Sequence, residues 1–331
     1  MRLTPLVSLA ASGLLVLTAT TACSSDAAVD ETEGSAAAGY PVSVDNCGTG
    51  VTLAKPPQRI VTIKSTSTDL VLALGLADKI VGTAFADGPV AEEWAEDAAD
   101  LPVLAEQAPS QEVVLETEPD LVLAGWESNF TADTAGERDM LAKLGVATYV
   151  APSACQEPGY QPAKMTFDLL FEHFTEAGRV LGVPEAAEKL VAQQRAALDK
   201  VGKALPGTTA LWWSSGEDTP FVGGTIGAPQ MVLDALGLEN VVREKATWTS
   251  YGWEAIVDAD PDVIVLVDAA WNSAKDKIAS LEANPATAEL TAVRKSRYLV
   301  VPFPAAEAGV RSVSAALELA DQLERYDLLV R

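Results

Sequence analysis

The chain has 331 residues, and 48% of them are apolar, which is enough for two domains of ordinary size or for one large one. Its formal net charge at pH 7 is −24. Because no basic stripe exists to neutralise phosphates, the composition argues against a protein that binds DNA or RNA. Such a self-repelling acidic surface is typical of a soluble protein outside the cytoplasm, or of one that meets a basic partner surface.

We predict that residues 1–22 form a signal peptide. Arg2 precedes a short apolar run that ends directly before Cys23, and polar residues follow at once, so the run is too short for a spanning helix. A Cys after a small residue is similar to a bacterial lipobox, in which the Cys is lipidated, although Thr20 stands where Leu is usual. Ordinary secretion with a free Cys is the alternative. Residues 23–39, rich in Ser, Ala, Gly and acids, predict a flexible tether.

Two further cysteines, Cys47 and Cys155, remain in the chain. In an exported protein an even number of cysteines predicts a disulfide, and two unpaired buried thiols are the alternative. The bond would tie the start of the mature chain to the end of its first half.

Residues 40–165 predict a first α/β lobe. Short apolar runs with β-branched residues alternate with helical runs, which indicates a parallel sheet covered on both faces. The predicted strands are RIVTIK, KIVGTA, DLVLAGW and VATYVAP.

Residues 166–183 predict one long connecting helix, because an aromatic stripe at helical spacing runs through them without a strand signal. Pro184 then begins another helix. Residues 184–331 predict a second α/β lobe, in which the alternation restarts with the strands TALWWSS, NVV, DVIVLVD and RYLVVPF.

One short phrase occurs twice, as QEVVLETEPDLVLAGW from Gln111 and as WEAIVDADPDVIVLVD from Trp253. Each copy has a Glu, Glu112 or Glu254, then seven positions on a Pro-Asp pair, then an apolar strand. The copies mark equivalent points of two lobes. We therefore predict an α/β fold of two Rossmann-like lobes with parallel sheets, joined by one long helix, with a ligand cleft at the carboxyl ends of the strands.

The chain offers little for catalysis. Its one histidine, His173, lies within a predicted helix, and a Ser-His-Asp triad or a zinc site needs a His that converges with other residues. The stretch GGTIGAPQ lacks the Lys-Ser/Thr of a P-loop, and no G-x-S-x-G occurs. We expect no catalytic residue, no metal site and no cofactor.

The candidate ligand-binding residues are mainly aromatic, because side chains at strand ends can stack on a flat ligand. About half of a larger aromatic set, which also includes Phe130, Trp212, Tyr251 and Trp253, should line the cleft, and one of the adjacent Trp212 and Trp213 should point inward. Filling of the lobe cores is the alternative for several of them. The candidates are Phe85, Trp126, Tyr160, Trp213, Trp248 and Trp271.

Two arginines follow predicted strands. Arg311, after the last strand, could pair with a carboxylate or phosphate of a ligand. A solvent-exposed helix start is the alternative for Arg311, and it is the favoured interpretation of Arg138.

The order of these features resembles the solute-binding lipoproteins of ABC importers, in particular the receptors for ferric siderophores, haem and corrinoids. The resemblance lies in the lipobox, the acidic tether, PPQRIVTIKSTSTDLVLALGL, and the EPDLVLAG and DPDVIVLVD strands, from about Tyr40 onward. It implies a lipid-anchored monomer on the outer face of the cytoplasmic membrane. It also implies that one Glu on each lobe, Glu112 and Glu254 here, docks a permease dimer that works with ATPase subunits.

A narrower resemblance exists to an actinobacterial subgroup described as receptors for a deazaflavin coenzyme precursor. ATYVAPSACQEPGYQP and VVPFPAAEAGVRSV are among the stretches that carry it. It implies a flat, anionic, conjugated ligand, which tryptophan stacking and Arg311 would suit, as they would a catecholate siderophore. The rival hypotheses are a chelatase-like or hydrolytic secreted enzyme on a similar fold, and an extracellular adhesion or scaffold protein.

Overall fold

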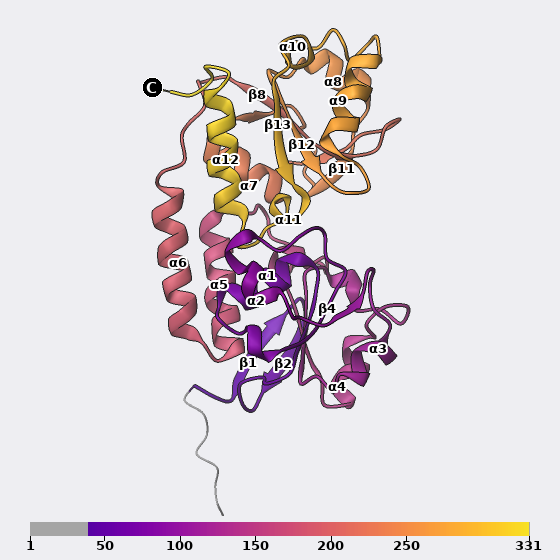
Figure 1. Ribbon diagram of the computed structural model, residues 1–331, viewed down its shortest axis with the longest axis vertical. Coiled ribbons are helices and arrows are strands. Elements are labelled where there is room, and N and C mark those ends of the chain that lie inside the picture. The colour runs from indigo at the N-terminus through magenta and orange to yellow at the C-terminus, as the bar shows by residue number, and fades with distance from the viewer. Residues whose placement is uncertain (1–38, 331) are drawn as a thin grey trace, which may run out of the picture. The chain divides into compact units, whose positions relative to one another are not determined.

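The computed structural model describes residues 39–330 (Figure 1). The predicted signal peptide, Cys23 and nearly all of the predicted tether lie outside the described residues. Within residues 39–330, no helix combines the length and the apolar character needed to cross a membrane.

The first lobe is built on a five-stranded sheet in which every neighbouring pair of strands is parallel, as expected. Its strand order is β5-β4-β3-β6-β7, so β4 and β5 are added on one side of β3, and β6 and β7 are added on the other. Open α/β sheets bind ligands at the point where the order reverses in this way, here between β3 and β6. The strands are β3 (Ile60–Ile63), β4 (Ile80–Ala84), β5 (Val103–Ala105), β6 (Leu121–Ala124) and β7 (Ala147–Val150). The helices of this lobe are α1 (Ser65–Ala73), α2 (Ala95–Ala98), α3 (Gln111–Glu116) and α4 (Arg138–Lys143).

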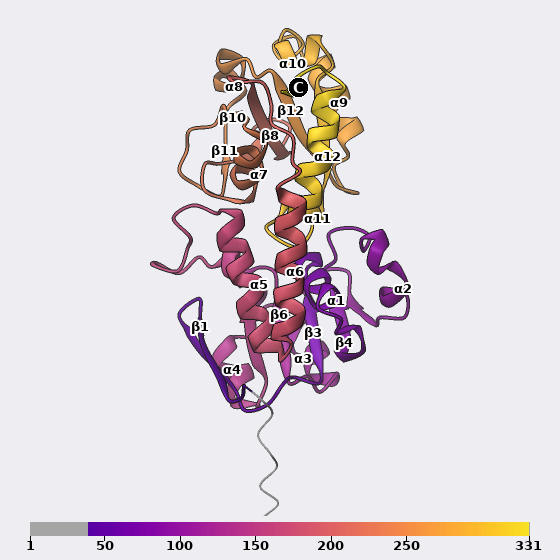
Figure 2. The same cartoon turned by 90° about the vertical axis from the view of Figure 1, so that its left-hand side faces the viewer.

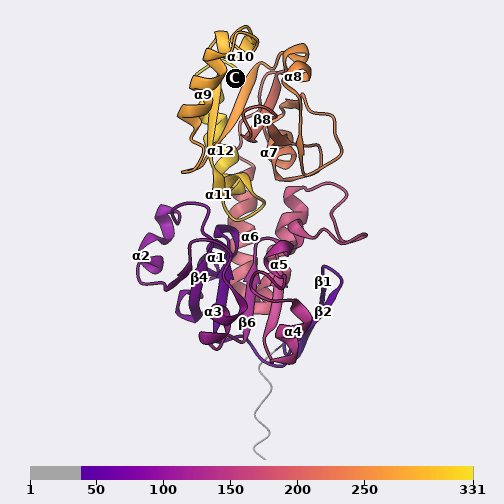
Figure 3. The same ribbon diagram turned by 90° about the vertical axis from the view of Figure 1, so that its right-hand side faces the viewer.

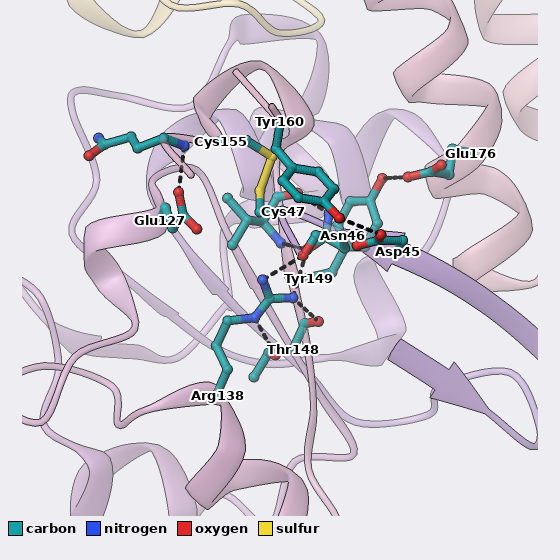
Figure 4. The surroundings of a disulfide bond; sticks show 12 residues. Asp45, Asn46, Cys47, Glu127, Arg138, Thr148, Tyr149, Cys155, Tyr160 and Glu176 are labelled. Atoms are coloured by element: carbon teal, nitrogen blue, oxygen red, sulfur yellow. Dashed lines mark hydrogen bonds between the residues drawn. A yellow bond between two sulfur atoms is a disulfide. The ribbon is translucent and has the colours of Figure 1, made fainter. Parts of the chain in front are cut away.

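A β-hairpin that we did not predict precedes the first sheet. It pairs β1 (Val42–Asn46) with β2 (Thr49–Leu53), and its two turn residues, Cys47 and Gly48, have φ of 52° and 78°. Two successive residues with positive φ match the twist of a two-residue hairpin. The predicted disulfide is confirmed, because Cys47 in this turn is bonded to Cys155 after β7 (Figure 4).

Arg138 supports the same hairpin from below (Figure 4). Its guanidinium donates to the backbone oxygen of Asn46 at 2.7 Å, to the side-chain oxygen of Asn46 at 2.8 Å and to Oγ1 of Thr148 at 3.0 Å. Asn46 in turn pairs with the backbone of Val150, the last residue of β7. Arg138 is thus a structural residue; it is neither the exposed helix start we favoured nor a ligand contact.

The helix α5 (Phe167–Leu181) lies beside α6 (Pro184–Leu198), as the view in Figure 2 shows. Gly182, with φ of 78°, ends α5 and reverses the chain, and Pro184 begins α6. The backbone of Met165, just before α5, already bonds to Ile226 of the second lobe, so α5 leads back along the first lobe. The passage into the second lobe is therefore made by α6, and not by the predicted helix at 166–183.

The second lobe has a mixed sheet of order β11-β9-β8-β12-β13, to which β10 adds by pairing with β8. Strands β8, β12 and β13 are parallel, as expected, but β9 and β11 run antiparallel to their neighbours because β9 returns from β8 through a tight loop. The strands are β8 (Thr209–Ser215), β9 (Phe221–Gly223), β10 (Glu239–Asn240), β11 (Trp248–Ser250), β12 (Val263–Asp268) and β13 (Tyr298–Pro302). The helices are α7 (Ala228–Leu236), α8 (Trp253–Ala259), α9 (Ala274–Ala283), α10 (Thr291–Arg294), α11 (Phe303–Ala306) and α12 (Ser312–Glu324).

The repeated phrase has the same structure in both lobes. The carboxylate of Asp120 accepts hydrogen bonds from the backbone just before β3, and that of Asp262 accepts one at 3.0 Å from the first backbone N–H of β8. The residue before each proline, Glu118 or Asp260, has a positive φ of 46° or 41°. Each Pro-Asp turn thus ends a helix and fixes the start of the neighbouring central strand.

Removal of the Cys47–Cys155 disulfide should destabilise the protein. The bond spans 108 residues, so its loss frees a long loop in the unfolded chain, and a double Cys→Ser variant should lose about 4 kcal/mol of unfolding free energy. Urea unfolding followed by tryptophan fluorescence measures this. A reducing agent should lower the midpoint of the wild type and leave that of the double variant unchanged. Equal midpoints for the oxidised wild type and the variant would contradict the prediction.

Candidate ligand-binding site

A cavity of about 400 Å³ lies between the carboxyl ends of the two sheets. The first lobe contributes the segments after β3, β6 and β7, and the second lobe those after β8, β12 and β13. Figures 1 and 3 both show α11, which follows β13, at the junction of the lobes. The cavity therefore occupies the position that the strand ends predict for a ligand.

Three predicted aromatic residues line this cavity: Trp126, Trp248 and Trp271. Trp271 is 65% exposed, which leaves its ring free at the rim. Two aromatic residues that we did not select, Phe221 and Phe303, also line it. Phe221 stacks on Trp248 with an angle of 16° between the rings, and Phe303 meets Trp271 edge-on. The lining is thus aromatic on both lobes.

The remaining wall of the cavity combines small or apolar residues with polar side chains, and it is almost uncharged. It presents hydroxyl and amide side chains that can donate and accept hydrogen bonds. These are Thr66, Ser128, Ser153, Gln156, Gln161, Ser214, Ser215 and Thr247. Glu307 is the one charged side chain among the described residues that line the cavity.

Three predicted ligand residues do not line the cavity. Trp213 is 1% exposed and packs against Trp253, because both faces of its sheet are covered. Its neighbour Trp212 is equally buried on the opposite face, so the alternation was right but neither ring points into the cavity. Tyr160 donates to Asp45 at 2.7 Å beside the hairpin. Phe85 lies behind the wall, edge-on to the ring of Trp126.

Arg311 is also not available to a ligand. Its guanidinium forms two hydrogen bonds to the carboxylate of Asp69 in α1, at 2.7 and 2.8 Å, and a third to the backbone of Pro89. The Asp69 side chain is 1% exposed. This bidentate pair joins the second lobe to the first, so our prediction that Arg311 binds a ligand anion was wrong.

Lys64 is a residue of this region that the sequence analysis missed. Its ammonium pairs with Asp87 and lies 3.5 Å from the ring centre of Trp126, 4.2 Å from that of Phe85 and 5.3 Å from that of Phe303. Aromatic faces attract a cation, so the three rings offset part of the free-energy cost of burying the Lys64 ammonium. Burial nevertheless lowers the pKa of Lys64, an effect that Asp87 opposes.

The backbone around Lys64 is unusual for a residue with a side chain. Lys64 has φ of 79° and ψ of 148°, a conformation that costs of the order of 1–3 kcal/mol outside glycine. Gly125 lies against it, and a Cβ at Gly125 would come 2.5 Å from Oγ1 of Thr66 and 2.8 Å from Cβ of Lys64. Strain and close approach thus coincide at the strand ends that form the cavity.

Glu307 follows α11 and reaches across to the first lobe. Its Oε2 accepts a hydrogen bond of 2.7 Å from Nε1 of Trp126. Burial raises the pKa of the Glu307 carboxyl, and the Trp126 N–H and the charge of Lys64 act in the opposite direction. A signal for it was present, since Glu307 lies in the FPAAEAGVRS stretch after the last strand, from which only Arg311 was chosen.

His173 lies in α5 behind the cavity. Its Nδ1 and the hydroxyl of Ser67 are buried and have no hydrogen-bond partner among the described residues. Burial lowers the pKa of His173 to about 4. Among residues 39–330, no group of three or more His, Cys, Asp or Glu side chains is arranged to hold a metal ion.

The two glutamates of the repeated phrase lie away from the cavity. Glu112 in α3 and Glu254 in α8 are exposed, and neither forms a hydrogen bond or ion pair within the described part of the chain. In Figure 1, α3 and α8 both lie on the side away from α6.

A family model described as periplasmic binding protein matches residues 60–305. The chain belongs to the periplasmic binding protein family. An uncharacterised ABC transporter substrate-binding lipoprotein of Bacillus subtilis, YvrC, is 26% identical over 294 residues, which cover 86% of each chain. A cobalamin-binding protein of Halobacterium salinarum is 27% identical over 246 residues, which cover 69% of this chain and 59% of that protein.

Solved structures show the same fold. A periplasmic binding protein from Veillonella parvula superimposes with a TM-score of 0.76 and 26% identity, over 85% of this chain and 97% of that one. An ABC-type Fe3+-hydroxamate transport system from Saccharomonospora viridis gives a TM-score of 0.72 and 26% identity, over 86% and 99%. The predicted family and the predicted fold class are confirmed. The narrower likeness to deazaflavin-precursor receptors stays a prediction.

Loss of Asp69 should strongly destabilise this periplasmic binding protein. Asp69→Ala leaves the Arg311 charge buried and unpaired, which costs about 3–5 kcal/mol of unfolding free energy. Adding Arg311→Met should recover at least about half of the loss. Asp168→Ala is the control, because Asp168 pairs with Arg195 on the surface and its loss should cost less than about 1 kcal/mol. Additive effects of the Asp69 and Arg311 changes in chemical denaturation would contradict the prediction.

The free energy of unfolding should decrease as the pH is lowered, because His173 binds a proton more readily in the unfolded chain than in the folded protein. Its pKa is lowered from 6.5 to about 4 in the folded protein, so between these values the unfolded state binds more protons. From pH 7 to pH 4 the wild type should therefore lose about 3 kcal/mol more unfolding free energy than His173→Gln does. Denaturation curves across this range measure the difference. Parallel pH profiles for the two proteins would show that His173 is not the cause.

Proposed function

We propose that this chain is the extracytoplasmic, lipid-anchored receptor of an ABC importer. It captures one bulky neutral or cationic ligand that carries many amide or hydroxamate oxygens, and it delivers that ligand to a permease dimer. The family and the named lipoprotein relative support the receptor class. Cys23, directly after a predicted signal peptide, supports the lipid anchor.

The proposed ligand class rests on the charges around the cavity. The two cationic side chains of this region already form ion pairs within the protein, Lys64 with Asp87 and Arg311 with Asp69. No lysine or arginine of residues 39–330 lines the cavity, so a carboxylate or phosphate there would lose its hydration without a partner. This replaces the anionic ligand that we inferred from Arg311.

The lining favours a corrinoid or a ferric hydroxamate over haem. Aromatic faces cover an apolar macrocycle or chelate, and hydroxyl and amide groups bond to its oxygens. Haem iron is usually held by His, Tyr, Met or a free Cys, and its propionates need cations. No His or Tyr of the described residues lines the cavity, Cys155 is bonded to Cys47, and Met165, the one Met of the lining, is only 1% exposed. The cobalamin-binding relative and the hydroxamate-transport neighbour agree with this choice.

The enzyme hypothesis receives less support. A hydrolytic or chelatase-like site needs an acid and a base that face the same substrate. The pKa values of Glu307 and Lys64 are shifted by burial, but only Glu307 lines the cavity, because three aromatic rings and Asp87 enclose Lys64. We therefore propose that the protein binds its ligand without reaction.

Titration with cyanocobalamin and with a ferric trihydroxamate tests the ligand class. Trp126, Trp248 and Trp271 line the cavity, so a coloured ligand there should quench tryptophan fluorescence and raise the melting temperature. Micromolar or tighter binding of one of the two is the expected result. Binding of neither by a folded protein would overturn the proposed ligand class.

Charge reversal tests delivery to the permease. Glu112→Lys together with Glu254→Lys should reduce uptake in cells at least about tenfold, while ligand binding stays unchanged, because exposed interface charges act mainly on association. Glu172→Lys with Glu318→Lys is the matched control, since it changes the same charge at exposed positions of α5 and α12. Unchanged uptake by the first variant would exclude docking through these residues.

A further inference from the structure

We infer that Glu307 selects the ligand by charge, favouring a ligand that presents a cation or an N–H donor at the junction of the lobes and rejecting one that presents a carboxylate. The inference rests on the proposed receptor function and names the residue that sets its specificity. It assigns to one side chain the difference between two otherwise similar ligands.

The position of Glu307 suits this role. It lies at the carboxyl end of β13 after α11, and it lines the cavity beside Trp126, Trp271 and Phe303. Within the described residues, Oε2 accepts the Trp126 N–H, and Oε1 accepts no hydrogen bond. The side chain is fixed by one oxygen and has the other available to a ligand.

The neighbouring charges leave Glu307 without a cation of its own. Lys64 is bound to Asp87, and Arg311 is bound to Asp69 by both oxygens of that carboxylate. Two cations and three carboxylates sum to one negative charge at this junction. That excess is on the one carboxylate that lines the cavity.

The surroundings strengthen the effect of this charge. Charges interact several times more strongly in a partly desolvated site than in bulk water, so a ligand cation gains and a ligand anion loses more here than at the surface. The aromatic wall adds to the preference, because the exposed ring of Trp271 also attracts cations. Burial raises the pKa of the Glu307 carboxyl, and the Trp126 N–H and the nearby charge of Lys64 oppose this rise, as a ligand cation would.

Three ferric trihydroxamates that share the same iron-binding core and differ only in their terminal group test the inference. They end in a primary ammonium, in its neutral N-acetyl form or in its anionic N-succinyl form. Dissociation constants from fluorescence quenching of the full-length protein should place the ammonium form about a hundredfold tighter than the succinyl form. In Glu307→Gln that ratio should fall to about tenfold or less, and binding of the neutral form should change less than about threefold.

Glu289→Gln is the matched control, because Glu289 is exposed and does not line the cavity, and it should keep the wild-type ratio. A second arm compares cyanocobalamin with its monocarboxylic acid, so that a receptor specific for corrinoids is tested equally. Binding with an unchanged charge ratio in Glu307→Gln would overturn this inference and leave the receptor function standing. Failure of all five compounds to bind the folded wild type would overturn the proposed ligand class and this inference with it.

Discussion

The pairing of Arg311 with Asp69 is the constraint on which the cavity depends. It places a buried guanidinium of the second lobe on a carboxylate of α1 in the first, in bidentate geometry. Buried charges persist only when they are paired, so this contact defines how the segment after β13 lies on the first lobe. The Trp126 to Glu307 hydrogen bond and the approach of Lys64 to Phe303 follow from the same placement.

These contacts also decide the chemistry of the cavity. The residues at the carboxyl ends of the strands bring cations and acids together, but the cations are used between the protein's own groups. What remains for a ligand is aromatic surface, neutral hydrogen-bonding groups and a single carboxylate. The unfavourable backbone conformation of Lys64 is held by this arrangement, which agrees with the common finding of strain near functional sites.

The repeated phrase combines a folding role with a proposed docking role. Asp120 and Asp262 fix the starts of β3 and β8, which explains why each lobe needs its Pro-Asp turn. The glutamate seven residues before each proline forms no hydrogen bond or ion pair within the described residues, and one such residue on each lobe suits a two-fold symmetric partner. A pair of lobes with equivalent core strands thus presents a pair of equivalent surface acids.

The sequence alone determined the two α/β lobes, most of their central strands and the Cys47–Cys155 pairing, because strand periodicity, turn residues and cysteine count are local signals. It also identified Trp126, Trp248 and Trp271 as cavity residues. Only the tertiary structure revealed the β1–β2 hairpin, the passage through α6, and the roles of Lys64, Glu307 and Arg311. The partner of a charge is a long-range property: Asp69 and Arg311 are 242 positions apart, and no local pattern shows that one neutralises the other.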